Sequence, residues 1–567
     1  MDRITTGLLE EFSKEHGIEK LDEPKRFEHF VSYITIRREF SASFDTADIV
    51  VGDGNDTGID AIACIVNGSL ITDVDSLTDF AANAEVLEVT FFFVQADRGG
   101  SFEASKIGTF GYGVNDFFKQ TPTLPRNASI IEAAKIMSAV YERSGKFKRG
   151  NPSCRLFYVT TGKWTAEAVP EARRVNNISD LKDTGLFRMV EFNCIGADII
   201  QKYYNQTKNG ISREFTFSSR VDAPEVPGVK EAYIGFIPVS QFLPIIKNDD
   251  GEIIRTIFYD NVRDWQDYND VNNEIRDTLR SDHKSRFVLM NNGITIIARG
   301  FHKTASKFHI EDFQIVNGCQ TSHVLFFESA SLDDSVQIPL RLIHTQDESV
   351  IDSIIKSTNR QTEVKPEQFA AITDFAKKLE MFFDSFALSN RLYYERRPGQ
   401  YDRLSVEKTR IVTQPNMVRA FAAMFLEEPH RTLRSYKSLT DRLGKDIYGA
   451  EHRLEPYYIA AFALYKLEYM FRSGKLDAKY RAARFHIILA ARYILDKSPF
   501  GQMNSRDTER RGKALVDSIS DSENIEATLA SATIVIDKIS SGNLDRDNIH
   551  TQTFTENLIK FLRQEKS

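Results

Sequence analysis

Acidic and amide side chains are spaced along the N-terminal part of the chain in a way that could hold a metal ion. Glu28 lies in a stretch with helical periodicity, Asp60 comes directly before an apolar run, and Gln95 and Asp97 end a second apolar run. Carboxylates hold one or two Mg²⁺ ions in phosphodiester hydrolysis, where the metal activates water and neutralises developing charge. Acidic residues in a Gly/Asp-rich turn, such as Asp56 in GDGNDTGID, more often only form a solvated turn. Both interpretations stay open at this point.

A second group of polar side chains lies at turns farther along the chain. A glycine turn that leads into a helix N-terminus offers backbone N–H groups, and asparagine and arginine side chains beside it would complete a pocket for a phosphate. The alternative is that the amides cap turns and the arginines form salt bridges. No Walker lysine motif is present in the sequence. The members of the group are Asn292, Asn317, Gln320, Thr321, Asn359, Arg360, Arg396 and Arg397.

The elements that would position the acidic group follow an α/β order over residues 1–208. Residues 5–18 and 23–40 have helical periodicity, and Asn67-Gly68 between two apolar runs predicts a hairpin. Val86–Gln95 is a continuous apolar run, as expected of a strand buried on both faces. Helix and strand patterns then alternate to the end of the segment. We therefore expect an α/β domain, followed by a polar linker.

The central segment, residues 227–346, is β-rich in its pattern. Phe287–Met290 and Ile294–Ala298 flank Asn291-Asn292-Gly293, which predicts two strands joined by a tight hairpin turn. Farther on, Phe313–Val316 runs into Asn317-Gly318 and then into an apolar helical run, which predicts a strand–turn–helix corner. Residues 347–567 show apolar positions mostly at helical spacing.

Several ordered motifs in this region together indicate one family. NNGITIIA is followed by IVNGCQTS, with further motifs at Val262–Asp264 and Asn269–Leu279 upstream and at Ser357–Thr362 and Tyr393–Arg397 downstream. This series resembles the abortive-infection phage-resistance (AIPR) family of prokaryotic proteins. The resemblance implies a role in defence against phage, and members of the family often carry a nuclease domain ahead of the motifs.

The N-terminal arrangement resembles the PD-(D/E)XK nuclease core, in particular its Mrr-like branch, which has glutamine in place of the acid in its last motif. By this resemblance Asp60 matches the first metal-binding acid, with Asp53 and Asp56 as alternatives in the same loop. Gln95 matches the motif glutamine, and Glu28 matches the acid carried on a helix. The resemblance implies Mg²⁺ or Mn²⁺ as the cofactor.

Position 97 departs from this pattern, because the family has lysine where this chain has Asp97. One interpretation makes Asp97 a second metal-binding acid beside Asp60 and Gln95, since positions 95 and 97 share one face of a strand. Lys106 on the following helix, or Arg98, would then replace the lysine. The other interpretation is an inactive site whose fold is kept for binding.

The composition is that of an ordinary soluble globular protein with about three domains, since the chain has 567 residues, of which 41% are hydrophobic and 27% charged. A net charge of −7 argues against a protein that coats nucleic acid non-specifically. No apolar run approaches the ~20 residues that span a bilayer. The N-terminus has no signal-peptide pattern, and the four cysteines are scattered. We therefore expect a cytoplasmic protein without a membrane span.

Taken with the two resemblances, the sequence predicts an antiphage effector of α/β + α class. Residues 1–208 would form a restriction-endonuclease-like α/β domain, residues 227–346 a β-rich AIPR domain and residues 347–567 a helical region. The expected activity is a Mg²⁺-dependent nuclease on DNA, with RNA as the alternative substrate. A homodimer and a partner protein of the same defence system are expected, because a nuclease needs restraint. The alternatives are a catalytically degenerate nucleic-acid-binding scaffold and a nucleotide sensor that uses the Asn/Arg pocket.

Overall fold

The chain forms two compact units in a computed structural model. The first unit joins residues 1–205 to residues 373–567, and the second consists of residues 206–372. The N-terminal α/β part and the helical C-terminal part therefore belong to one unit. The class predicted from the sequence, mixed α/β with a helical C-terminal region, is confirmed. The structure describes residues 1–38, 40, 43–52, 54, 56–148, 150–208, 211–248, 251, 253–258, 270–358, 374–397, 399–402, 404, 406–434 and 436–564.

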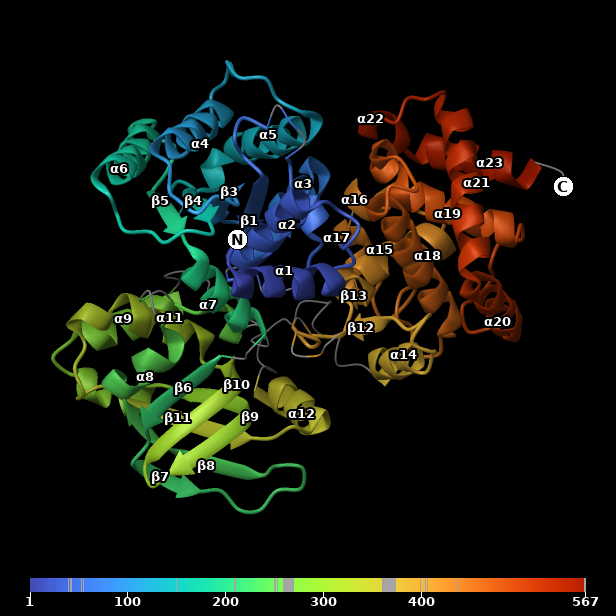
Figure 1. Ribbon diagram of the computed structural model, residues 1–567. Helices are drawn as coiled ribbons and strands as arrows, with labels where there is room; N and C mark the ends of the chain where they lie inside the picture. The colour runs from blue at the N-terminus through green and yellow to red at the C-terminus, as the bar shows by residue number, and fades with distance from the viewer. Residues whose placement is uncertain are drawn as a thin grey trace. The chain divides into compact units, whose positions relative to one another are not determined.

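A five-stranded mixed sheet in the order β2-β1-β3-β4-β5 is the centre of the first unit (Figure 1). β1 is antiparallel to β2 and to β3, whereas β3, β4 and β5 run parallel. The predicted Asn67-Gly68 hairpin is confirmed, because both residues have positive φ between β1 and β2. The strands are β1 (Ala61–Val66), β2 (Ser69–Ile71), β3 (Val89–Asp97), β4 (Ser153–Thr160) and β5 (Met189–Ile195).

Helices cover both faces of this sheet because β3 is apolar on both sides. Phe91 and Phe93 pack into one core with α3 to α6, and Phe92 and Val94 pack into the other with α1, α2 and α7. Such burial of a central strand matches its unbroken apolar run. The helices are α1 (Arg3–Glu15), α2 (Glu23–Ile36), α3 (Val74–Asn83), α4 (Ala104–Phe117), α5 (Ala128–Tyr141), α6 (Ala168–Asp183) and α7 (Ala197–Lys208).

The C-terminal part of the first unit is a helical assembly around two apolar helices, α18 and α19. It packs on the α/β part through α16 and α17, which contact α3. Arg472 on α18 also forms an ion pair with Asp45 at 3.1 Å. Its elements are α14 (Asp374–Asp384), β12 (Tyr393–Glu395), β13 (Ile411–Thr413), α15 (Gln414–Phe425), α16 (Arg431–Arg434), α17 (Tyr436–Thr440), α18 (Glu455–Arg472), α19 (Arg484–Leu495), α20 (Arg506–Ser520), α21 (Ser522–Ser540), α22 (Arg546–Ile549) and α23 (Gln552–Gln564).

The second unit is a six-stranded sheet in the order β6-β10-β9-β11-β8-β7, with one core formed by the sheet and its helices. β9 and β11 pair in parallel, and the other neighbours are antiparallel. Its elements are β6 (Ser212–Thr216), β7 (Ser219–Asp222), β8 (Glu231–Pro238), α8 (Val239–Ile246), α9 (Asp270–Arg280), α10 (Phe287–Met290), β9 (Ile294–Thr304), β10 (Lys307–Asn317), α11 (Cys319–Phe327), β11 (Gln337–His344) and α12 (Glu348–Thr358).

The predicted hairpin around Asn291-Asn292-Gly293 is wrong. Phe287–Met290 forms the short helix α10, and the hairpin partner of β9 is β10, joined through Ala305. Asn291 instead accepts a hydrogen bond from the Gly293 N–H through its Oδ1 at 2.8 Å, which is a local turn from helix into strand. Asparagine and glycine, which form hairpin turns, thus also form this connection between α10 and β9.

The predicted strand–turn–helix corner is confirmed. β10 ends at Asn317, Gly318 takes φ +95°, and α11 begins at Cys319. Glycine suits this position because a Cβ there would lie 2.7 Å from Cγ1 of Ile294. Among the described residues no helix is long and apolar enough to cross a membrane.

Candidate active site

Asp60 is fixed at the point where β1 begins beside the end of β3. Its backbone N–H donates to the carbonyl of Val94 at 2.8 Å, next to the Ala61–Val94 register pair. Its side-chain Oδ2 accepts a hydrogen bond from the backbone N–H of Ala96 at 2.6 Å. The side chain is buried, with 8% of the residue exposed. The antiparallel pairing of β1 and β3 therefore holds this carboxylate at the end of β3, where sequence reasoning placed the motif glutamine.

Helix α2 brings Lys25 and Glu28 to the same place. The helix begins after Asp22, whose carboxylate caps the Lys25 N–H, and it packs its apolar face on the sheet. Lys25 and Glu28 are one turn apart, and Lys25 Nζ lies 3.1 Å from Glu28 Oε2. Lys25 Nζ also donates to the backbone carbonyl of Gly52.

Gly52 marks the point on which these charged groups converge. A Cβ at this position would lie 3.0 Å from Glu28 Oε2, 3.3 Å from Asp60 Oδ1 and 3.4 Å from Lys25 Nζ. The two carboxylates and the ammonium group thus surround one small volume, and glycine leaves that volume open. We refer to Lys25, Glu28, Gly52 and Asp60 as the acidic cluster.

Burial raises the pKa of Asp60 to about 7, and its neighbours modify this effect in both directions. The hydrogen bond from Ala96 favours the ionised form, Glu28 and Asp56 disfavour it through like charge, and Lys25 favours it. A carboxylate that is costly to ionise is the expected consequence of placing two acids around one buried volume. Such perturbed carboxyl groups concentrate at functional sites, although structural networks also contain them.

Gln95 lies against the loop that leads to Asp60. Its Oε1 would be 3.2 Å from a Cβ at Gly58, a residue that has φ +74°. In the same loop Asp56 accepts a hydrogen bond from the Gly58 N–H at 2.9 Å, so this acid forms a turn. Asp53, the other alternative acid, lies outside the described residues.

Asp97 belongs to a separate polar group on the side of the sheet that α4 covers. Its Oδ2 accepts hydrogen bonds from Lys106 Nζ and from the Tyr158 hydroxyl, both at 2.9 Å, and its Oδ1 accepts from the Gly99 N–H at 2.9 Å. Burial alone would raise the pKa of Asp97, but the bonds from Lys106, Gly99 and Tyr158 hold this pKa below its ordinary value. Lys106 is therefore the ion-pair partner of Asp97.

Sequence reasoning missed Lys25. It sought the absent lysine on β3, on α4 or at Arg98, and Arg98 pairs with Glu23 at 3.0 Å, where both side chains are well exposed. The available signal was the spacing of Lys25 and Glu28, which places both side chains on one face of a helix. Tyr158 was missed because its contact with Asp97 depends on the pairing of β3 with β4.

The donor set of the acidic cluster suits Mg²⁺ or Mn²⁺. It offers two carboxylates and the Gly52 carbonyl, with the Gln95 amide near the same loop, and Mg²⁺ usually takes one or two carboxylates and keeps water or substrate phosphate as its other ligands. Within the described part of the chain no three His, Cys, Asp or Glu side chains gather into a metal-binding group. A cation would also offset the cost of ionising the buried Asp60.

The residues predicted to form an anion pocket are divided between the two units. In the second unit Gln320 accepts a hydrogen bond from Asn272 at 2.8 Å, Thr321 accepts one from Asn291 at 3.0 Å, and Asn292 is exposed. In the first unit Arg396 and Arg397 are buried, and Arg396 Nε pairs with Glu380 Oε2 at 2.5 Å.

Asn317 ends β10 at an irregularity in the register with β9, and Asn359 and Arg360 lie outside the described residues. The anion pocket as a whole stays a prediction.

Comparison with known proteins identifies one family. A family model described as AIPR protein matches residues 258–541, which is half of the chain. No curated protein and no solved structure matches the chain. The family match begins after the N-terminal α/β part, so it does not include the acidic cluster.

Proposed function

Because the chain belongs to the AIPR protein family, we propose that it is a cytoplasmic antiphage defence effector whose N-terminal α/β part is a metal-dependent nuclease of the PD-(D/E)XK type. The observation that carries the proposal is the convergence of Lys25, Glu28 and Asp60 on Gly52 beside the end of β3. Two carboxylates can hold the metal ion that activates water in phosphodiester hydrolysis, and a lysine beside them can stabilise the charge that develops on the phosphate. The order helix, hairpin, buried strand and helix around them is the one that the nuclease resemblance implies.

Glu28 and Asp60 would hold Mg²⁺. Gln95 stays a candidate ligand, as the nuclease resemblance implies, but its amide lies against Gly58 and not at Gly52, where the two acids converge. When bound, the ion supplies an activated water and neutralises charge on the phosphate. Asp60 is kept in place by the Ala96 N–H, so its carboxylate is oriented before substrate arrives. Asp97 stays a candidate ligand, but its Oδ2 already accepts two hydrogen bonds, and the geometry favours Glu28 as the second acid.

We assign to Lys25 the role of the catalytic lysine, which the nuclease pattern places at position 97 on β3 and this chain replaces by Asp97. Its ammonium group lies beside both acids and would stabilise negative charge on the phosphate or orient the attacking water. Lys106 is a weaker candidate for this part, because it is bound to Asp97 on the side of the sheet that α4 covers.

The proposed substrate is DNA, with RNA as the alternative. A homodimer would place two such sites on a duplex, and a partner protein of the same defence system would restrain cleavage until infection. Both assemblies follow from the proposed role as a nuclease.

A second candidate is a degenerate nuclease fold kept for nucleic-acid binding. It is favoured by the lysines that already neutralise the acids, Lys25 at Glu28 and Lys106 at Asp97. Cleavage of plasmid, linear duplex, single-stranded DNA and RNA with Mg²⁺ or Mn²⁺ separates the two candidates. The nuclease predicts metal-dependent cutting that is lost in Asp60→Asn, whereas the degenerate fold predicts binding that survives Asp60→Asn and no cutting.

A further inference from the structure

The side chain of Asn127 holds the backbone on both sides of Gly52, the residue that leaves the acidic cluster open. Its Nδ2 donates to the carbonyl of Val51 at 2.7 Å and to the carbonyl of Gly54 at 3.2 Å. Its Oδ1 accepts a hydrogen bond from the Ile130 N–H at 2.9 Å and so caps α5. One amide thus fastens the backbone around the acidic cluster to the first turn of α5.

Capping of α5 does not by itself require an amide at position 127. The other side-chain caps that the structure describes come from aspartate, serine or threonine, which are common helix caps like asparagine. An ionised aspartate has no proton to donate to the two carbonyls, and a serine hydroxyl has one proton for two acceptors. The N–H₂ group of the asparagine therefore does something that capping does not explain, because it holds two carbonyls at once.

Two further hydrogen bonds fix the same backbone to other elements of the fold. The Val51 N–H donates to the carbonyl of Asp60 at 2.8 Å, directly before β1. The carbonyl of Gly52 accepts from Lys25 on α2. The backbone at Gly52 is therefore held between the start of β1, α2 and the Asn127 amide at the start of α5.

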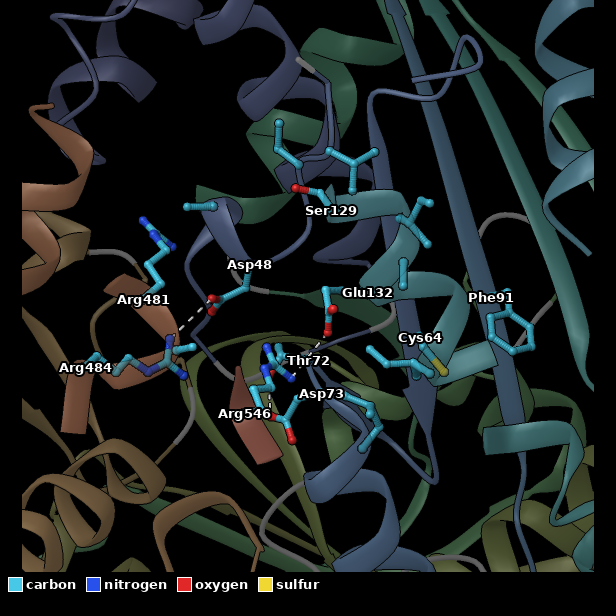
Figure 2. A pocket seen from close by; sticks show the side chains of 18 residues that line it. Asp48, Cys64, Thr72, Asp73, Phe91, Ser129, Glu132, Arg481, Arg484 and Arg546 are labelled. Atoms are coloured by element: carbon cyan, nitrogen blue, oxygen red, sulfur yellow. Dashed lines mark hydrogen bonds and ion pairs between the residues drawn. The ribbon is translucent and has the colours of Figure 1, made fainter. Parts of the chain in front are cut away.

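Packing leaves room between this backbone and α5. Val51 lines a cavity of about 210 Å³ together with Ser129 and Ala133 of α5 (Figure 2). Side chains on two sides of a cavity make no dispersion contact across it, so packing fixes their separation less firmly there. The hydrogen bonds of Asn127 supply a connection between the two elements that apolar contact leaves incomplete.

Asn127 is itself positioned by a buried carboxylate in the last turn of α4. Asp116 is 1% exposed and accepts hydrogen bonds from the Thr123 N–H at 3.0 Å and from the Leu124 N–H at 3.1 Å. Arg126 donates to the backbone carbonyl of Asp116 at 2.9 Å. These bonds shape the connection from α4 to α5, which ends at Asn127. The amide is thus in place before a metal ion or a substrate binds.

We propose that Asn127 is a positioning residue of the acidic cluster, which keeps the volume at Gly52 open for a divalent cation; this inference rests on the nuclease proposed above. Without the N–H₂ group the carbonyls of Val51 and Gly54 lose their common donor. The backbone at Gly52 can then move into the volume between the two carboxylates. Side chains that orient a metal site from outside its ligands typically contribute about 10- to 100-fold to metal affinity.

Mn²⁺ binding by the full chain, measured by calorimetric titration, tests this proposal with two variants. Asn127→Ser and Asn127→Asp both keep a cap for α5 and remove the N–H₂ group. We expect each variant to weaken Mn²⁺ binding by about tenfold or more. The aspartate adds a negative charge that by itself favours a cation, so weaker binding by Asn127→Asp separates positioning from electrostatic attraction.

Hydrogen exchange at the Val51 N–H, followed by mass spectrometry in the absence of metal, is the second measurement. This N–H is bonded to the Asp60 carbonyl, and it exchanges when the backbone around Gly52 opens. We expect exchange to be about tenfold faster in Asn127→Ser, because the opened backbone no longer has to break the bonds to the amide. This readout does not depend on cleavage or on a bound ion.

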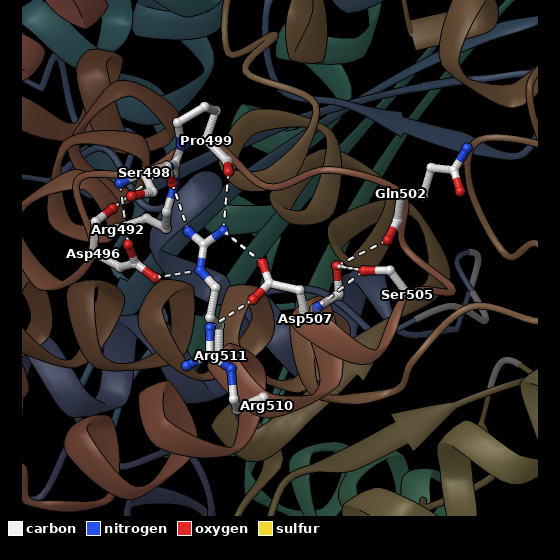
Figure 3. Close-up of polar contacts among 10 residues, drawn as sticks. Arg492, Asp496, Ser498, Pro499, Gln502, Ser505, Asp507, Arg510 and Arg511 are labelled. Atoms are coloured by element: carbon white, nitrogen blue, oxygen red, sulfur yellow. Dashed lines mark hydrogen bonds and ion pairs between the residues drawn. The ribbon is translucent and has the colours of Figure 1, made fainter.

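Two residues of α20 provide the controls (Figure 3). Ser505→Ala removes a helix cap elsewhere in the chain, since Ser505 accepts from the Thr508 N–H at 3.1 Å. Arg510→Met is the surface control, because Arg510 is 77% exposed and pairs with Asp507. Both should bind Mn²⁺ and exchange at Val51 like the wild type, and thermal melting shows whether each variant is folded.

The outcomes separate this inference from the nuclease assignment. A wild type that binds Mn²⁺ but cuts no nucleic acid would contradict the nuclease, whereas weaker binding and faster exchange in Asn127→Ser would still support the positioning role. Mn²⁺ affinity and Val51 exchange that are unchanged in Asn127→Ser would overturn the proposal. Binding by Asn127→Asp as tight as that of the wild type, or a wild type that binds no Mn²⁺, would also overturn it.

Discussion

Asp60 Oδ2 accepts a hydrogen bond of 2.6 Å from the backbone N–H of Ala96, the residue between Gln95 and Asp97. This bond connects an acid that precedes β1 to the middle of the three residues, Gln95–Asp97, that end β3. It fixes Asp60 on the end of β3 while the side chains of Gln95 and Asp97 lie on the face that α4 covers. The acid partner that the geometry gives Asp60 is consequently Glu28 from α2.

Replacing Asp60 by asparagine should stabilise the protein as the pH rises. The folded state raises the pKa of Asp60 from 3.8 to about 7, so the folded protein binds this proton more tightly than the unfolded chain. The free energy of unfolding therefore falls as the pH rises between these values, by about 1.4 kcal/mol for each pH unit. The asparagine side chain keeps an acceptor for Ala96 and removes the penalty. We expect the advantage of Asp60→Asn over the wild type to grow by about 2.5 kcal/mol from pH 5 to pH 8, measured by urea unfolding.

Mg²⁺ serves as the internal control in this experiment. If the ion binds at Asp60, it should recover part of the penalty in the wild type and narrow the difference at the higher pH. A stability difference that is constant across pH would show that Asp60 ionises normally in the folded protein. A difference that Mg²⁺ leaves unchanged would contradict metal binding at this acid.

Lys25 and Lys106 can be compared as matched lysines of one domain. Lys25→Met should lower the rate of cleavage by about 100-fold, because it removes a charge beside the acidic cluster. Lys106→Met should cost less than about tenfold, since Lys106 is 45% exposed and contacts Asp97 and Glu103. Initial rates of plasmid nicking at saturating metal give both numbers. The reverse order of the two effects would place the catalytic lysine on α4.

Gly52→Ala should reduce cleavage by about tenfold or more with little loss of stability. The added methyl group would lie 3.0 Å from Glu28 Oε2 and 3.3 Å from Asp60 Oδ1, so both carboxylates must shift from the shared volume. Gly145→Ala is the control, because nothing lies within 4 Å of its added Cβ. Equal cleavage by the two variants would mean that the open volume at Gly52 has no part in the reaction.

The sequence was informative wherever local pattern decides the outcome. The Asn67-Gly68 turn, the buried strand β3 and the helix α2 that carries Glu28 were all predicted. The position of Lys25 beside Asp60 was not, because it depends on how α2 packs over the sheet and on the approach of Gly52. Tyr158 was missed for a similar reason, since the pairing of β3 with β4 is set by tertiary structure.

The region around Gly293 shows the limit of turn signals. Asn-Gly permits positive φ, but it does not say whether a hairpin or a helix-to-strand connection uses that freedom. β9 takes its partners, β10 and β11, from later in the chain, and Phe287 is buried in the core from the helix α10. The structure of residues 287–293 is therefore decided by the burial of Phe287 in the core and by the pairing of β9 with later strands, and not by the Asn-Gly signal alone.

Gly293→Ala should destabilise the second unit by about 2–4 kcal/mol. The residue has φ +82°, and a Cβ would lie 2.7 Å from the carbonyl oxygen of Pro339 on β11. Gly251→Ala is the matched control, because Gly251 has φ +81° with nothing within 4 Å of the added Cβ. Its cost should be the backbone strain alone, about 1 kcal/mol. Equal unfolding midpoints for the two variants in urea would show that the contact with β11 is not restrictive.

The most direct test of a nuclease site at the acidic cluster is metal-dependent cleavage of plasmid DNA by the wild type, Asp60→Asn and Lys25→Met. Arg510→Met is the folded control. We predict cutting by the wild type and the control with Mg²⁺ or Mn²⁺, none with EDTA, and loss of cutting in Asp60→Asn and Lys25→Met while both variants stay folded. Cutting that persists in Asp60→Asn, or DNA and RNA left intact by the wild type with either metal, would contradict a nuclease site at the acidic cluster.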